Sequence, residues 1–480
     1  MIEKENPPNI VIFMPDSMRG DTISLGGTIN PYIKTPNIDR LAEEGLAFTN
    51  CFCVNPVCVP SRCCTFTGQY VHSNGHRSLY QLLQPYEENL FKILKEKGYQ
   101  VIWAGRNDLF DKDSIKLSIS KQIRIKPRFY KLNPFPIDHY LRKSFYYGET
   151  IKEESEDIDF FIIKDVLKYL ESNVNTPFCL FIALNFPHPP YTVEEPYFSM
   201  YDRNDVPTPI LSKFDDKPEY MKLMYERYGL MNLEEKDFKE IIATYYGMIT
   251  RVDYQLGEVI NKLKEIGEYE NSAIFFISDH GDFTGDYGLT EKWPNAFQDC
   301  LIKVPLVAKI PGVFPKAKIF NQLIQTIDIF PTILEITRIQ TPYTHYGKNL
   351  ISLIKGEIDK FRTAVFAEGG YNINEPQCFE NVVKSPDIPH VGIYYDKTNI
   401  PLQKPQSVAR SAMIRTQSWK LIIRDAGKEE LYNLIQDPKE IENLIGDESY
   451  KRIKIELKEL LLRWYLRTSD SPHWRRARYI

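Results

Sequence analysis

The chain has 480 residues, more than a single hydrophobic core usually organises, which favours one large domain with a smaller companion. Its hydrophobic content of 43% and charged content of 26% are typical of a soluble globular protein. The net charge of -4 gives no electrostatic reason to expect a nucleic-acid partner, and no stretch is long and apolar enough to span a bilayer.

The N-terminus and the cysteines indicate the compartment. Residues 1–8 are polar and charged and contain no apolar segment of the kind found in a signal peptide. Eight cysteines include Cys51, Cys53 and the adjacent pair Cys63 and Cys64, which would form wrong disulfides in an oxidising compartment. We therefore expect a cytoplasmic protein, unless a leader precedes this sequence. These four cysteines lack two Cys-x-x-Cys pairs, so a structural zinc site is not expected.

The first predicted strand ends at an acidic residue. Residues 9–14 form a short, mostly apolar run between Pro8 and Pro15, as in a strand buried on both faces of a parallel sheet. Asp16 follows directly, and ligands of open α/β sheets gather at the carboxyl ends of the strands. Asp16 is therefore placed to bind a metal or an anion, although an Asp after a strand can also cap a helix. Residues 35–45 form the next predicted helix.

The second predicted helix begins with the cluster Cys58-Val59-Pro60-Ser61-Arg62 and ends at Gly68. Pro is favoured in the first position of a helix, where its missing N–H would have no partner. The thiol of Cys58 would then lie at a helix N-terminus, where the helix dipole favours a negative charge. Such a position suits a thiol of low pKa or an anionic substrate. The alternative is a buried cysteine that caps an ordinary helix.

Predicted strands and helices continue along the chain up to about residue 360. Further strands are predicted at 100–105, 178–186, 273–277 and 304–311, and further helices at 88–97, 157–170, 233–267 and from 327. Polar residues follow three of these strands: Arg106 and Asp108, then His188 between prolines, then Asp279, His280 and Lys292.

The Cys58 segment and the residues after the 273–277 strand together resemble a known family. Three signatures, Cys-x-Pro-Ser-Arg from Cys58, Ser-Asp-His-Gly-Asp from Ser278 and Gly-Asp-x-Gly-Leu from Gly285, are similar to those of the type I sulfatases. This family belongs to the alkaline phosphatase superfamily, so the resemblance implies an alkaline-phosphatase-like α/β fold with a large mixed, mostly parallel sheet flanked by helices. It extends over nearly the whole chain, and its richest motifs are too far apart in sequence to be one local accident.

The resemblance implies a covalent modification and a metal site. In the family, the cysteine equivalent to Cys58 is oxidised after translation to a formylglycine aldehyde. One hydroxyl of the hydrated aldehyde attacks sulfur, and the other later expels the sulfate. One divalent cation would be held by Asp16, Asp279, His280 and the formylglycine made from Cys58; Ca²⁺ is expected, with Mn²⁺ or Mg²⁺ as alternatives. Ser17 stands where the family often has a further metal-ligand residue.

The resemblance also implies which residues contact the sulfate. Arg62, Arg106 and Lys292 would stabilise charge on the nucleophile and on the sulfate oxygens. His188 would protonate or hydrogen-bond the leaving alcohol. Arg106 takes the place of a lysine in the family pattern and keeps its positive charge. Asp108 takes the place of a histidine that reaches the substrate, so substrate specificity can depend on this change.

Two loops and the C-terminal region complete the prediction. Residues 115–145 are rich in basic and aromatic residues and form either a solvated loop or a rim that attracts a polyanionic sugar. Residues 191–230 are expected to form a wall of the active site, and a linker-like stretch at 369–405 can reach over it. The catalytic domain is predicted to span 1–360. A smaller C-terminal α+β domain, 361–480, contains an antiparallel sheet and a closing helix and resembles that of the family.

We therefore expect an enzyme, a sulfatase, that hydrolyses a sulfated carbohydrate or another small sulfate ester. Its expected partners are that substrate and a formylglycine-generating enzyme that matures Cys58. Two alternatives stay open. A phosphonate monoester or phosphodiester hydrolase of the same superfamily would use the same nucleophile and metal, and an unmatured protein would bind sulfated sugars without cleaving them. The sequence does not indicate which alcohol carries the sulfate, or the oligomeric state.

Overall fold

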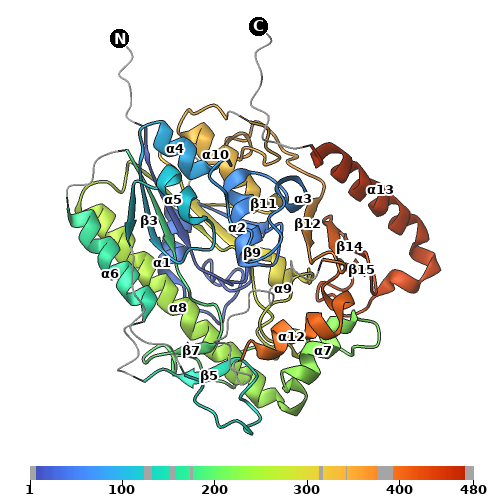
Figure 1. The fold of residues 1–480 in the computed structure, drawn as a ribbon. Helices are drawn as coiled ribbons and strands as arrows, with labels where there is room; N and C mark the ends of the chain where they lie inside the picture. Colours follow the sequence, from blue (N-terminus) through green and yellow to red (C-terminus); the bar gives the residue numbers. More distant parts are fainter. Residues whose placement is uncertain are drawn as a thin grey trace.

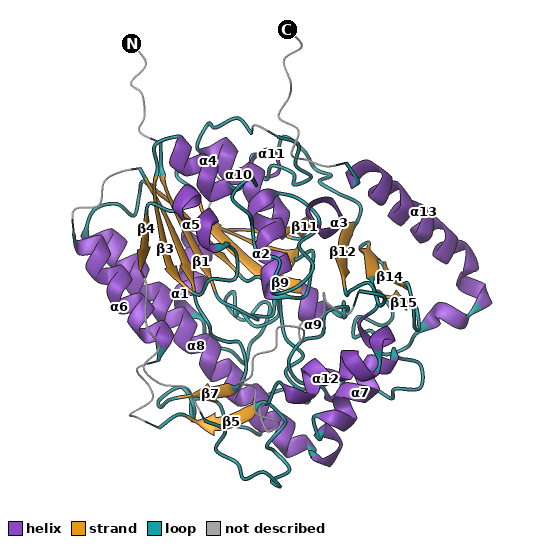
Figure 2. Cartoon of the chain, in the orientation of Figure 1, coloured by secondary structure: helices purple, strands orange, loops and turns teal. Residues whose placement is uncertain are grey.

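The computed structural model describes residues 7–123, 132–151, 157–172, 177–312, 317–341, 343–375 and 393–470. Its centre is a nine-stranded mixed sheet (Figure 1, Figure 2). β11 (Ile324–Gln325) pairs with β2, and the other strands follow in the order β10 (Lys318–Phe320), β2 (Leu46–Phe52), β9 (Lys303–Lys309), β8 (Ser272–Ile277), β1 (Asn9–Met14), β6 (Phe178–Ala183), β3 (Gln100–Gly105) and β4 (Lys121–Ile123). The expected α/β architecture is confirmed.

β9 is the strand of this sheet that runs against its neighbours, and the others are parallel. β1, β6 and β8 consist of buried residues, as their apolar sequences predict for strands covered on both faces. The sequence did not indicate β2. Its pairing with β9 shifts between Phe48 and Cys51, where Thr49 and Asn50 interrupt the apolar pattern.

Two groups of helices cover the sheet (Figure 1). One group contains α1 (Pro36–Glu44), α6 (Ile158–Glu171) and α8 (Glu235–Glu265), and the other contains α2 (Cys58–Thr67), α4 (Leu90–Glu96) and α10 (Ile329–Ile336). α8 begins with a capping box between Glu234 and Asp237, and its middle, residues 241–253, is buried on all faces. The shorter helices are α3 (Val71–Asn74), α5 (Lys112–Ser118), α7 (Glu219–Arg227), α9 (Asp299–Ile302) and α11 (Ile351–Ile354).

A second, antiparallel sheet follows in the C-terminal part of the chain and confirms that prediction. Its strands run in the order β12 (Val365–Gly369), β13 (Ser411–Arg415), β14 (Trp419–Arg424) and β15 (Glu430–Asn433). The closing helix α13 (Lys451–Thr468) packs on it through Leu457, Leu461 and Trp464. Val365 and Met413 share a hydrophobic cluster with β1, so the two sheets have a continuous core. The domain boundary at residue 360 stays a prediction.

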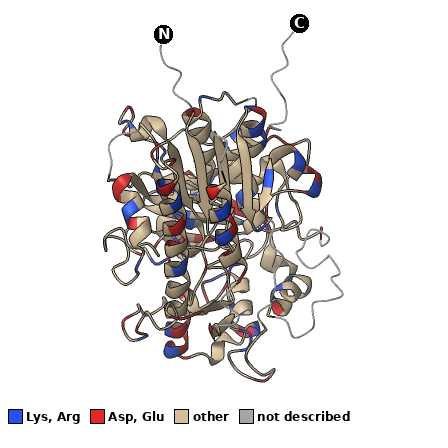
Figure 3. Ribbon diagram, turned by 90° about the vertical axis from the view of Figure 1, so that its left-hand side faces the viewer, with Lys and Arg blue, Asp and Glu red and all other residues tan. Residues whose placement is uncertain are grey.

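The predicted loops contain more regular structure than expected. The described part of 115–145 includes the end of α5 and β4. β5 (Tyr146–Glu149) begins just beyond it and pairs with β7 (Tyr191–Val193). Of the basic residues of the proposed rim, Lys121 begins β4, whereas Arg124, Lys126 and Arg128 lie outside the described residues. Basic and acidic residues are interspersed along the long helices (Figure 3). Among the described helices, none combines the length and the apolar character needed to cross a membrane.

Candidate active site

The predicted helix from Cys58 to Gly68 is present as α2. Val57 caps it in an extended conformation, and Cys58 is its first residue. Gly68 ends it with a φ of 70°, in the left-handed region that glycine adopts without steric cost. Pro60 is the third residue of the helix rather than the first. This position is also tolerated, because N–H groups of the first turn have no partner within the helix.

The expectation of a low-pKa thiol is wrong. Cys58 is 1% exposed, and burial, followed by the nearby Asp16, raises the pKa of its thiol well above the usual value although Lys292 opposes this. The unmodified side chain is therefore a neutral thiol and a weak nucleophile. The surroundings of position 58 give no support to thiolate chemistry.

Four side chains from three segments meet at the carboxyl end of the large sheet. Asp16 follows β1, Asp279 and His280 follow β8, and Cys58 begins α2. One potential ligand atom from each lies within 4.8 Å of the other three. The sulfur of Cys58 is 3.2 Å from Nε2 of His280 and 3.5 Å from Oδ1 of Asp16. The fold thus brings together the four residues that the sequence analysis assigned to a metal.

Arg62 pairs with the two carboxylates of this cluster. Its Nη2 donates to Oδ2 of Asp16 at 2.7 Å, and its Nε donates to Oδ2 of Asp279 at 2.9 Å. All three side chains are fully buried. Burial alone would raise the pKa of Asp16, but the surrounding cations, Arg106 foremost, hold it well below its usual range. One guanidinium therefore holds the two carboxylates next to each other.

The donor set fits a divalent cation. Nδ1 of His280 lies 2.8 Å from the carbonyl oxygen of Gly281, so a proton on Nδ1 leaves the lone pair of Nε2 directed toward Cys58. Burial lowers the pKa of His280, which keeps the ring neutral, as a metal ligand must be. Two carboxylates and one imidazole suit Ca²⁺, Mn²⁺ or Mg²⁺ better than a structural zinc ion.

Ser17, which departs from the family pattern, contacts both carboxylates. Its backbone N–H donates to Oδ1 of Asp279 at 3.1 Å, and its hydroxyl donates to Oδ1 of Asp16 at 2.8 Å. Its φ of 65° lies in the left-handed region, which a serine adopts only where the surrounding structure holds it. Ser17 therefore orients the two carboxylates by hydrogen bonds.

Arg106 and Asp108, the altered pair after β3, bind each other. Nε of Arg106 lies 2.6 Å from Oδ2 of Asp108, and its Nη1 lies 3.4 Å from Oδ2 of Asp16 and 3.3 Å from Oδ1 of Asn185. The side chain of Arg106 is 29% exposed, so an anion can reach it. Asp108 is also 3.9 Å from Nη1 of Arg62. Asp108 therefore contacts two cations of the site, and its contact with the substrate stays a prediction.

Lys292 and His188 lie at the same site. Burial alone would lower the pKa of Lys292, but Cys58, Glu291 and Asp16 raise it well above its usual value, so the ammonium is charged. Nδ1 of His188 lies 2.6 Å from the carbonyl oxygen of Pro189. Burial, reinforced by the charge of Lys292, lowers the pKa of His188 well below its usual value. Without a bound anion, the imidazole of His188 is therefore neutral at pH 7.

Three further residues at the site were missed by the sequence analysis. Lys397, in α12 (Tyr395–Gln403), places its Nζ 2.7 Å from Oε2 of Glu291, whose Oε1 lies 3.0 Å from Nζ of Lys292. Tyr394 donates to the carbonyl oxygen of Pro189 at 3.2 Å, and its ring centroid lies 6.4 Å from that of His188. The part of 369–405 that the structure describes thus lies against the site. No motif marks Tyr394 or Lys397.

Comparison with known proteins assigns the family. A family model described as Sulfatase matches residues 8–339, which is more than half of the chain. The chain belongs to the sulfatase family. A model described as N-sulphoglucosamine sulphohydrolase, C-terminal, matches residues 378–466 of this sulfatase. The resemblance stated from the motifs is thereby confirmed, and so is the expectation of an enzyme.

Relatives of this sulfatase match it along most of their length. An arylsulfatase from Clostridium perfringens is 26% identical, with 95% of this chain and 94% of the relative covered. An N-acetylglucosamine-6-O-sulfatase from Bacteroides thetaiotaomicron is 25% identical, with 96% of this chain and 86% of the relative covered. The crystal structure of a phosphonate monoester hydrolase of Agrobacterium radiobacter matches with a TM-score of 0.78 at 22% identity, covering 96% of both chains. This likeness confirms the alkaline-phosphatase-like fold.

Proposed function

We propose that this sulfatase hydrolyses sulfate esters with a formylglycine made from Cys58 and one divalent cation, and that its substrate is a sulfated carbohydrate or another small sulfate ester. The observation that carries the proposal is the position of Cys58. Its sulfur lies 3.2 Å from Nε2 of His280 and 3.5 Å from Oδ1 of Asp16, inside the buried cluster of acidic and imidazole ligands. The sulfatase-family match supports the modification, and the relatives named for sugar sulfates support the substrate class.

Asp16, Asp279, His280 and the modified residue 58 would hold the cation, with Ca²⁺ the expected ion. When bound, the cation supplies Lewis acidity at a sulfate oxygen and at the hydroxyl of the nucleophile. The protein's own part is to fix the ligands: Arg62 and Ser17 hold the two carboxylates by hydrogen bonds, and Gly281 fixes the imidazole of His280. A rigid ligand set keeps the nucleophile in place relative to sulfur.

Arg106 and Lys292 would bind the remaining sulfate oxygens and stabilise the charge that grows on them. Both are charged, and Arg106 can form two parallel hydrogen bonds to an oxyanion. His188 is neutral in the free protein. A bound sulfate places negative charge beside it, which favours protonation of the imidazole, and the ring can then donate that proton to the leaving oxygen.

The alternative is a phosphonate monoester or phosphodiester hydrolase of the same superfamily. Two observations favour it: the replacement of the family lysine and histidine by Arg106 and Asp108, and the structural likeness to a phosphonate monoester hydrolase. Sulfate and phosphonate groups present similar oxygens, so the same cations suit both. A cytoplasmic location and maturation by a formylglycine-generating enzyme are further parts of the proposal.

The test compares rates on an aryl sulfate and on an aryl phosphonate monoester, using protein produced together with a formylglycine-generating enzyme. We expect faster turnover of the sulfate, and a loss of turnover by at least about a thousandfold in Cys58→Ala, because the nucleophile is removed. Dominant turnover of the phosphonate would transfer the assignment to the alternative. Unchanged hydrolysis by Cys58→Ala would overturn the mechanism itself.

A further inference from the structure

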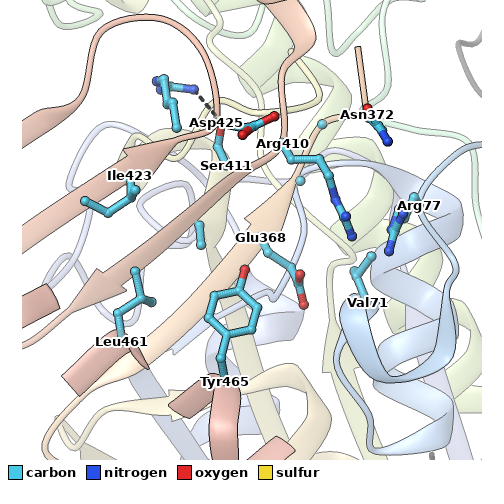
Figure 4. A pocket seen from close by; sticks show the side chains of 14 residues that line it. Val71, Arg77, Glu368, Asn372, Arg410, Ser411, Ile423, Asp425, Leu461 and Tyr465 are labelled. Atoms are coloured by element: carbon cyan, nitrogen blue, oxygen red, sulfur yellow. Dashed lines mark hydrogen bonds between the residues drawn. The ribbon is translucent and has the colours of Figure 1, made fainter. Parts of the chain in front are cut away.

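A cavity of about 610 Å³ lies between the end of β12, the start of β13, α3 and α13 (Figure 4). Polar side chains from four separate segments line it: Arg77, Asn372, Arg410 and Tyr465. None of these residues belongs to the site described above. The volume is within the range of cavities that hold a small ligand, and convergent polar groups are what fix the orientation of such a ligand.

Two guanidinium groups face the same part of this cavity. Figure 4 shows the side chains of Arg410 and Arg77 next to each other, across from Tyr465. Burial, followed by Glu368, raises the pKa of Tyr465, whereas Arg410 and Arg77 both oppose the rise, so both charges act on the same phenol group. Like charges that converge on one cavity favour an anion between them.

The carboxylates of the cavity do not neutralise Arg410. Glu368 binds His72 instead. Its Oε1 accepts a hydrogen bond from the backbone N–H of His72 at 3.0 Å and lies 2.6 Å from Nδ1 of the same residue. Asp425 lies at the exposed edge of the cavity. Among the residues that the structure describes, the guanidinium of Arg410 has no hydrogen-bond or ion-pair partner. Its five donors are therefore available to a ligand.

The backbone of Arg410 and the ring of Tyr465 are held in place before any ligand arrives. The backbone of Arg410 donates to Tyr371 at 3.0 Å and accepts from Asp425 at 2.8 Å. The ring of Tyr465 packs on His72 with centroids 4.7 Å apart. A guanidinium on a fixed backbone, beside an aromatic ring, suits a sugar that carries an acidic group.

We propose that this cavity is a second saccharide site, separate from Cys58, which binds an anionic group, sulfate or carboxylate, on a further sugar of the substrate. The proposal rests on the proposed function and specifies its substrate as an oligosaccharide with more than one anionic group. The cavity wall is joined to the catalytic segments: Gly370 donates to Pro294 at 3.0 Å, and Asn55 donates to Glu368 at 2.8 Å. Pro294 and Asn55 are close in sequence to Lys292 and Cys58.

The first test measures binding of a sulfated heparin tetrasaccharide by calorimetry to full-length Cys58→Ala protein, which cannot turn over the ligand by the proposed mechanism. Arg410→Gln in this background should weaken binding about tenfold, because charge-assisted hydrogen bonds are lost. Arg410→Lys, which keeps the charge, should lose less. Arg467→Gln is the matched control, because Arg467 is an exposed residue of α13 outside the cavity lining. Equal binding by Arg410→Gln and its parent would overturn the proposal, and so would an equal loss in Arg467→Gln.

The second test uses matured enzyme and separates this site from the proposed function. Arg410→Gln should raise KM for the tetrasaccharide about tenfold and leave kcat/KM for 4-nitrophenyl sulfate unchanged, because a small aryl sulfate cannot reach both sites. An equal loss on both substrates would show that the substitution disturbs the active site and would overturn a separate saccharide site. If neither substrate is hydrolysed, the proposed function fails, while the calorimetric comparison still decides whether the cavity binds the saccharide.

Discussion

Glu291 lies between two buried lysines, and this arrangement makes the charge at Lys292 depend on Lys397. Nζ of Lys292 and Nζ of Lys397 lie 3.0 Å and 2.7 Å from different oxygens of Glu291. Burial alone would raise the pKa of Glu291, but the two lysines lower it to about 2. Lys397 thus takes up part of the negative charge of Glu291 and leaves the ammonium of Lys292 freer to attract an anion.

We predict that Lys397→Met lowers kcat on an aryl sulfate by about tenfold or more, because Glu291 then holds Lys292 alone and competes with the substrate for it. The pKa of Glu291 should rise when one cation is removed, and protonation of Glu291 releases Lys292, so the loss in rate should become smaller as the pH falls. Kinetics across pH measure both effects. Lys404→Met is the control, because Lys404 is exposed in its pair with Glu219. An unchanged pH profile with lowered activity would indicate a structural defect instead.

At the residue scale, the sequence identifies side chains that stand in motifs. Asp16, Cys58, Asp279 and His280 each follow a strand or begin a helix, so strand order alone brings them to one edge of the sheet. Tyr394 and Lys397 carry no such mark, because their position depends on how α12 packs against the site. Such contacts are set by tertiary structure, which one sequence does not reveal.

At the scale of elements, α6 fixes the segment that carries His188. Asp159 of α6 accepts from the backbone N–H of Asn185 at 2.8 Å and of Phe186 at 2.8 Å. Burial, followed by the charge of Asp157, raises the pKa of Asp159 to about 7. In the unfolded chain this carboxyl titrates near ~3.9. The folded state therefore binds one more proton between these values, and its stability falls as pH rises from about 4 to about 7.

We predict that Asp159→Asn reduces the loss of unfolding free energy between pH 5 and pH 8 by about 2 to 3 kcal/mol, because an amide does not ionise. Urea unfolding of wild type and variant at pH 5 and at pH 8 measures this change in unfolding free energy. Glu440 and Asp253 also have raised pKa values, of about 7 and about 6, so the difference between wild type and variant, not the wild-type slope, reports on Asp159. An identical slope in both proteins would contradict the assignment.

The sequence predicted a helix or strand correctly where its apolar pattern and the turn residues at its ends indicated the same boundaries. β1 and β3 begin and end where the sequence indicated, since each is an uninterrupted buried strand with turn residues beyond it. The sequence did not predict β2, because Thr49 and Asn50, at the shift in its pairing with β9, interrupt the apolar pattern. The order of strands in the sheet and the reversed direction of β9 depend on connections that no local pattern encodes.

At the scale of the whole molecule, the buried cluster joins parts of the chain that are far apart in sequence. Asp16 follows β1, Cys58 begins α2, and Asp279 and His280 follow β8. Without a cation, the carboxylates of Asp16 and Asp279 share the guanidinium of Arg62. Two buried carboxylates that share one guanidinium repel each other, and this repulsion destabilises the folded state. A divalent cation that binds only the folded protein stabilises it in proportion to the logarithm of its concentration over Kd.

We therefore predict that Ca²⁺ at a hundredfold excess over its Kd stabilises the EDTA-treated protein by about 2.7 kcal/mol and raises its Tm by a few degrees. Differential scanning fluorimetry measures this without any substrate. Asp279→Asn removes one charged ligand and should abolish most of the shift, whereas Asp425→Asn, an exposed acidic residue far along the chain from these ligands, should keep it. If Ca²⁺, Mn²⁺ and Mg²⁺ all leave the Tm unchanged, or if Asp279→Asn responds like the wild type, the cluster is not a cation site. Arg62 and Arg106 would then be the counter-charges described beside these two carboxylates, and the four residues would lose their proposed role as metal ligands.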